Sequence, residues 1–168
     1  MKWWENPKVS VVWTVVRVWL GLQWIEGGWH KINDGFDASG FLQGALAKAG
    51  GDHPAVQGWY AGFLEGFAVP NIELFNVLVP WGEFLVGVGL ITGLATIPAL
   101  IAGAFMNLNF LMAGTVSTNP ILFTAAIILL FAGKGAYNYG GDRWLIPYMK
   151  GHFFKNKHKH EPKKAVVY

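Results

Sequence analysis

Two charged side chains of opposite sign lie inside long apolar stretches of this sequence. Arg17 follows an apolar run that begins after Lys8, and Glu83 directly precedes the charge-free segment 84–133, which also lacks histidine. An ionised group is costly inside a hydrocarbon layer, so such residues face inward, pair with one another and usually serve a function. We therefore predict that Arg17 and Glu83 form a buried ion pair or share one hydrogen-bond network.

Depth estimates place amide side chains beside these two charges. At ~1.5 Å per helical residue, Arg17 lies roughly 13 Å and Glu83 roughly 18 Å from the ends of their helices, near the middle of a ~30 Å hydrocarbon layer. Asn107 lies roughly 15 Å and Asn109 roughly 18 Å into a third helix. Polar groups at one level predict a site that binds a ligand headgroup or moves a proton. The alternative is that the ion pair only fixes the register of the helices.

Further candidate binding residues surround this level. Trp24 and Trp81 could form the walls of a pocket for an aromatic ring. Lys31 lies near the end of the first helix, where it could attract an anion. Glu26 and His30 are four residues apart and are expected to pair on another face of that helix.

Four apolar helices must position these residues. The sequence is 53% hydrophobic and 14% charged, which is too apolar for a soluble domain of 168 residues. One membrane crossing takes ~20 residues, and glycine, proline and asparagine punctuate the apolar segments. The sequence therefore predicts an all-α fold, an integral membrane four-helix bundle within residues 1–145. Its helices are expected at residues 9–31, 72–93, 97–115 and 120–138.

The connecting segments fix the expected orientation. Residues 33–70 contain apolar residues at helical spacing, which predicts two short amphipathic helices that form an outer cap. The tail, 146–168, is basic and is expected to be solvated and attracted to anionic lipids. Lysine and arginine gather near both chain ends, so the positive-inside rule places both termini in the cytoplasm of a multi-pass protein of the cell membrane.

Several kinds of chemistry are excluded by residue type. The chain has no cysteine, so it cannot form disulfides, thiolate metal sites or iron–sulfur clusters by itself. Haem that is held by two histidines needs both of them within the membrane-crossing helices. Only His30 lies near such a helix, so this kind of haem site is not expected. No metal site is predicted. The basic residues lie mostly at the chain ends, which favours lipid headgroups over nucleic acid as their partner.

Three motifs in order resemble those of the DoxX/DoxD-like membrane proteins. They are Arg17-x3-Gly21-x6-Gly28-x2-Lys31, then Gly82-Glu83-x3-Gly87-x-Gly89-x3-Gly93 followed by Met106-Asn107, and a closing Gly133-x-Gly135-x3-Tyr139-Gly140-Gly141-Asp142-Arg143-Trp144. The resemblance extends from about residue 10 to residue 145. It implies a prokaryotic four-helix membrane protein, and the best-known branch of the family contributes a subunit to thiosulfate:quinone oxidoreductase.

The resemblance and the buried charges together predict a quinone-linked membrane oxidoreductase or its membrane subunit. Arg17 and Glu83 are the expected catalytic residues, because the guanidinium could bind a quinone carbonyl and the carboxylate could move a proton. The expected partners are membrane lipids, membrane quinone and a second redox subunit. A non-enzymatic scaffold or assembly protein and a lipid- or small-solute-binding membrane protein are the alternatives.

Overall fold

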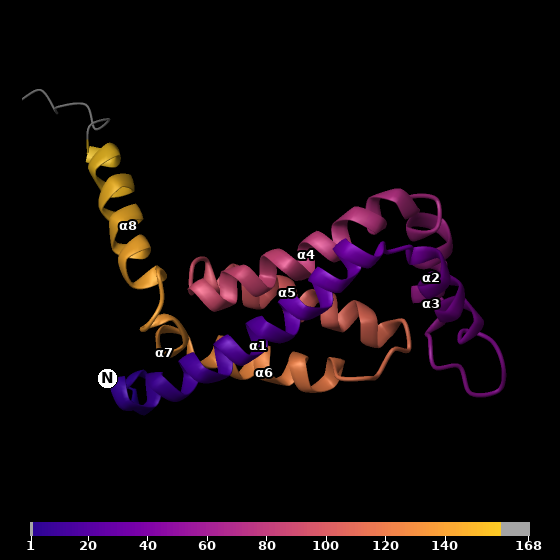
Figure 1. The fold of residues 1–168 in the computed structure, drawn as a ribbon, viewed down its shortest axis with the longest axis horizontal. Coiled ribbons are helices and arrows are strands. Elements are labelled where there is room, and N and C mark those ends of the chain that lie inside the picture. Colours follow the sequence, from indigo (N-terminus) through magenta and orange to yellow (C-terminus); the bar gives the residue numbers. More distant parts are fainter. Residues whose placement is uncertain (1, 159–168) are drawn as a thin grey trace, which may run out of the picture.

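The described part of the chain, residues 2–158 of a computed structural model, consists of helices joined by turns and loops and contains no strand (Figure 1). This confirms the predicted all-α class. In chain order the elements are the 3₁₀ turn η1 (Trp3–Glu5), α1 (Pro7–Asp34), α2 (Ala38–Ala47), α3 (Gly58–Phe63), the π-helical turn η2 (Leu64–Ala68), α4 (Ile72–Thr92), α5 (Thr96–Met112), α6 (Asn119–Ala132), α7 (Lys134–Tyr137) and α8 (Asp142–His158).

Four long helices pack side by side and enclose the main core. Helix α1 contacts α4 and α6, and α5 contacts the same two helices, so the four form a closed arrangement that we call the helical body. Its interior is filled by aliphatic side chains with no solvent exposure, among them Leu20, Leu90, Leu100 and Leu129.

Glycines allow α1 and α4 to approach backbone to backbone. A Cβ atom on Gly28 would lie 2.6 Å from the Phe84 nitrogen, and one on Gly87 would lie 2.7 Å from the Ile25 nitrogen. No side chain larger than hydrogen fits at either position. Close contacts through small residues are typical of helix pairs in membranes, where dispersion replaces the hydrophobic effect as the packing force.

Residues 33–70 form a cap over one end of the helical body. The short helices α2 and α3 lie where the sequence predicts two amphipathic helices, and they share a second small core that includes Leu42, Val56 and Tyr60. Tyr60 donates a hydrogen bond to the Asn109 carbonyl group and to its Oδ1, each at 3.1 Å, and so ties the cap to α5. Burial raises the pKa of the Tyr60 hydroxyl, which keeps this donor protonated.

The fourth predicted helix ends earlier than residue 138. Gly133 has a φ of 52°, a left-handed value that glycine adopts easily, so α6 stops at Ala132 and the short α7 follows. The segment expected to be a solvated tail begins as helix α8, which starts at Asp142. Residues 159–168, where the rest of the predicted tail falls, lie outside the described residues.

Within residues 2–158, one helix is both long enough and apolar enough to cross a membrane by itself, namely α4 with 21 residues. Helices α5 and α6 are apolar but shorter, with 17 and 14 residues. Helix α1 has 28 residues but carries several charged side chains, including Arg17 and Lys31.

Candidate functional site

Near the cap, a lysine and a glutamate form a buried ion pair between α1 and α4. Lys31 Nζ lies 2.7 Å from Glu83 Oε2, and the two side chains are 30% and 5% exposed. A Cβ atom on Gly27 would lie 3.1 Å from the same carboxylate oxygen, so glycine leaves room for Glu83 against α1. The positive charge of Lys31 thus compensates the negative charge of Glu83, and a buried charge requires such a partner.

Two buried polar side chains on α1 and α5 lack a hydrogen-bond partner within the described chain. Asn107 on α5 has no solvent exposure, and both its Oδ1 and its Nδ2 lack a hydrogen-bond partner within the described chain. Trp24 Nε1 on α1 is buried and likewise unpartnered there. Buried polar atoms in native proteins are almost always hydrogen-bonded, so these orphaned groups indicate a place where another molecule donates or accepts.

The packing of α4 against α5 sets the level of these groups. A Cβ atom on Gly82 would touch the Met106 side chain, so Glu83 and Asn107 occupy neighbouring positions across the antiparallel helix pair. Trp24 lies one turn away, because its indole ring contacts Gly103 on α5. We call Trp24, Lys31, Glu83 and Asn107 the polar cluster. The sequence-based depth estimate correctly places Glu83 and Asn107 at one level.

The predicted contact between Arg17 and Glu83 is wrong. Across the α1–α4 pair, Glu83 lies beside Gly27 while Arg17 lies beside Gly93, so ten residues separate the two charges along each helix, or roughly 15 Å. The depth estimate for Arg17 failed because it counted from Lys8 as if α1 began to pack against α4 there. Helix α1 begins at Pro7 and extends past the end of α4, so its first turns pack against α7 and η1 instead.

Arg17 is held by backbone at the opposite end of the helical body. Its Nη2 donates a 2.9 Å hydrogen bond to the Tyr139 carbonyl group, and its guanidinium lies between Gly93 and Gly140. The side chain is 1% exposed, yet Nε and Nη1 have no hydrogen-bond partner among the described residues. Among the described residues, the acid that attracts the guanidinium is Asp142, which is itself buried.

Asp142 is a structural residue that the sequence reasoning did not single out. Its two carboxylate oxygens accept hydrogen bonds from the backbone nitrogens of Ala95 and Thr96, at 2.8 and 2.7 Å, and so cap the start of α5. Its own nitrogen donates to the Gly93 carbonyl group at 2.8 Å. We call Arg17, Gly93, Gly140 and Asp142 the arginine clamp. The sequence signal that could have indicated this role is the Gly140-Gly141-Asp142 triplet directly before Arg143.

Replacing Asp142 with alanine is expected to destabilise the protein by about 3 kcal/mol, because two charge-assisted cap bonds and the nearest counter-charge of Arg17 are lost together. The measurement is the midpoint of detergent-solubilised unfolding followed by circular dichroism. Asp37→Ala is the matched control, since Asp37 caps α2 in the same way but is exposed, and it should cost about 1 kcal/mol. Equal losses in the two variants would contradict the clamp.

The remaining predicted site residues lie apart from the polar cluster. Asn109 is engaged by Tyr60 in the cap, and its Nδ2 donates to the Phe105 carbonyl group at 2.8 Å. Trp81 is 50% exposed and packs edge-on against Phe84 on the surface, so it does not face Trp24. Glu26 is exposed, and the expected pair with His30 is wrong, since His30 Nδ1 lies 3.6 Å from Asp34.

The comparisons with known proteins gave one finding. The family model described as DoxX matches residues 12–118, which covers α1, the cap, α4 and α5. The comparison with curated proteins gave no match. The comparison with solved structures also gave none. The matched span contains the whole polar cluster but, of the arginine clamp, only Arg17 and Gly93.

Proposed function

Because the chain belongs to the DoxX family of membrane proteins and carries orphaned hydrogen-bonding groups beside a buried ion pair, we propose that it is a membrane subunit of a quinone-linked oxidoreductase. The observation that carries this proposal is Asn107, a fully buried amide with neither of its polar atoms partnered in the described structure. Some members of the family are linked to quinone chemistry, which favours a quinone ring as the missing partner.

The proposed topology is four crossings by α1, α4, α5 and α6, with both termini on the cytoplasmic side. Each helix presents large apolar side chains to the surroundings, for example Trp19, Leu85, Phe105 and Phe131, which are 40–81% exposed. A soluble protein rarely exposes so much contiguous apolar surface, whereas a lipid-facing one must. Basic residues near η1, α7 and α8 favour the cytoplasm for that end.

The residues of the polar cluster divide the proposed chemistry between them. A bound quinone supplies a ring that accepts electrons and takes up protons when it is reduced. Asn107 Nδ2 and Trp24 Nε1 would donate hydrogen bonds to a ring carbonyl oxygen and hold it in place. Glu83 would carry the proton, and Lys31, its partly exposed partner, would keep the carboxylate ionised between transfers. This assigns the carbonyl contact to Asn107 and Trp24 in place of Arg17.

The electrons are proposed to come from a second redox subunit. Without cysteine, the chain cannot hold an iron–sulfur cluster or a dithiol by itself. The electron donor is therefore proposed to lie on a partner subunit. Membrane lipids are the other proposed partners, and they would surround the helical body. The test is to extract the purified protein and to measure quinone in the extract by absorbance. A stoichiometric amount of quinone is expected.

Asn107→Leu and Asn109→Leu are expected to have opposite effects. Asn107→Leu removes buried polar atoms that have no partner in the chain, so thermal stability should stay equal or rise while quinone affinity falls about tenfold. Asn109→Leu removes the Oδ1 that accepts from Tyr60 but keeps the backbone acceptor, so stability should fall by about 1 kcal/mol with quinone affinity unchanged. Titration with a short-chain quinone and a melting curve measure both. Unchanged affinity in Asn107→Leu would refute the site.

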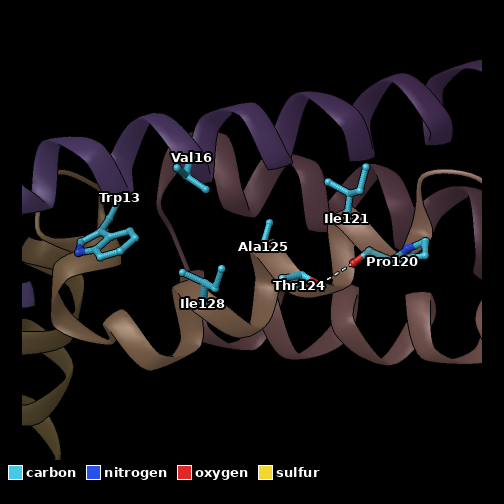
Figure 2. Close-up of a pocket in the computed structure, with 7 residues that line it drawn as sticks. All are labelled: Trp13, Val16, Pro120, Ile121, Thr124, Ala125 and Ile128. Atoms are coloured by element: carbon cyan, nitrogen blue, oxygen red, sulfur yellow. Dashed lines mark hydrogen bonds between the residues drawn. The ribbon is translucent and has the colours of Figure 1, made fainter.

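A second candidate function, lipid binding without electron transfer, is favoured by an apolar groove between α1 and α6 (Figure 2). Its volume is about 480 Å³, and it is lined by Trp13, Val16, Pro120, Ile121, Thr124, Ala125 and Ile128. The one hydroxyl group there, on Thr124, already donates to the Pro120 carbonyl group at 2.7 Å, so the groove suits an acyl chain. Phospholipid without quinone in the extract would favour this function.

A further inference from the structure

Helix α8 leaves the helical body at the end where the N-terminus lies. Figure 1 shows it running steeply across the direction of α1, away from the other helices. Beyond Asp142, which is fixed in the arginine clamp, its first turns are largely exposed: Trp144 is 71% and Tyr148 is 74% exposed. A helix that has both large apolar and basic side chains on its surface, and little packing against its own protein, is suited to an interface.

The side chains of α8 are sorted around its axis. Leu145 and Met149 are one turn apart and form an apolar stripe. Trp144 and Tyr148 follow one flank of this stripe, where aromatic rings with a polar edge fit the headgroup level of a bilayer. Arg143 and Lys150 are seven residues apart and lie together on a third side, the basic flank, roughly 100–160° around the axis from the stripe. No acidic residue occurs in the range 143–160 of the sequence.

We propose that α8 lies along the membrane surface and binds anionic phospholipid headgroups through its basic flank. The charge sign selects an anionic surface, and the apolar stripe supplies the contact with the acyl boundary. The direction of α8 fits this placement, because a helix that runs across membrane-crossing helices lies in the plane of the bilayer. The inference rests on the proposed membrane crossings of the helical body, but it does not rest on quinone binding.

The absence of cysteine makes a direct test possible, since one introduced thiol takes up one label. The full chain is labelled with a nitroxide at Met149→Cys or at Gly151→Cys and reconstituted in liposomes of phosphatidylglycerol and phosphatidylcholine or of phosphatidylcholine alone. Gly151 lies on the side of α8 opposite Met149, and a side chain there meets no neighbouring atom. In anionic liposomes the label at residue 149 should be accessible to oxygen and the label at 151 to a water-soluble nickel chelate.

Neutralising the basic flank should weaken this docking. On the Met149→Cys background, Lys150→Gln is expected to lower the ratio of docked to undocked label about fivefold, since each basic residue near an anionic surface contributes about 1 kcal/mol. Equal accessibility of the two labels in anionic liposomes would overturn the proposal. Equal docking in phosphatidylcholine alone would overturn its headgroup selectivity. Neither measurement involves quinone, so either failure leaves the polar cluster to its own test.

Discussion

Replacing Gly93 with alanine is expected to destabilise the protein by at least about 3 kcal/mol, because backbone strain and steric overlap would act together. Gly93 has a φ of 65°, a left-handed conformation that costs an alanine about 1–2 kcal/mol. In addition, the new Cβ atom would overlap Nη1 of the buried Arg17 and lie 2.6 Å from the Gly140 Cα. The guanidinium cannot move without losing its bond to Tyr139. The unfolding midpoint in detergent measures the loss.

Two matched variants separate the causes of this effect. Gly140→Ala places a methyl group 2.6 Å from the same Nη1 atom without a positive φ, so it should reproduce only the steric part. Gly44→Ala adds a methyl group to an open position of α2 and should leave stability unchanged or raise it by up to about 1 kcal/mol. A Gly93→Ala protein as stable as Gly44→Ala would show that Arg17 does not occupy the clamp.

Glu83→Gln is expected to lower quinone-linked turnover at least about 100-fold, because a positioned proton carrier contributes that much or more to rate. Glutamine has nearly the same shape and can still accept a hydrogen bond from Lys31, so the helices should keep their packing. The assay is quinone reduction by the purified complex, recorded as a pH profile. Any titrating limb of the profile that belongs to Glu83 should vanish in the variant.

Glu73→Gln provides the control for this experiment, since Glu73 lies on the same helix but is exposed. Its turnover should match that of the unmodified protein. Undiminished turnover in Glu83→Gln would remove Glu83 from the mechanism. A Glu83→Gln protein that melts much earlier, with turnover per folded molecule unchanged, would assign the ion pair to packing alone.

The helical fold was predictable because long apolar segments with glycine and proline breaks leave few alternatives to helices. The level shared by Glu83 and Asn107 was also predictable, since both lie on helices whose ends are marked by turn residues. Arg17 was misplaced because nothing in the sequence marks where α1 passes the end of α4. Only the packing of Gly21 and Gly28 against α4 sets that register. The partner of Arg17 lies 122 residues away, beyond the reach of spacing arguments.

The other feature that the sequence did not predict was which of several neighbouring charges form pairs. The prediction paired Glu83 with Arg17, whereas the antiparallel register of α1 and α4 pairs it with Lys31. His30 likewise had an acid one turn away on each side, Glu26 and Asp34, and contacts the second. Trp81 could not be assigned to core or surface from the sequence, because α4 is apolar on every side.

The arginine clamp also imposes an order on biosynthesis. A ribosome releases Arg17 long before Tyr139 and Asp142 exist, so α1, α4, α5 and α6 are all synthesised while the guanidinium still lacks its acceptor and its counter-charge. Residues 139–142 therefore complete the interior after the four helices of the body have been made. A chain that stopped before Gly140 would contain the four helices of the body yet leave Arg17 without the counter-charge that Asp142 supplies in the complete fold.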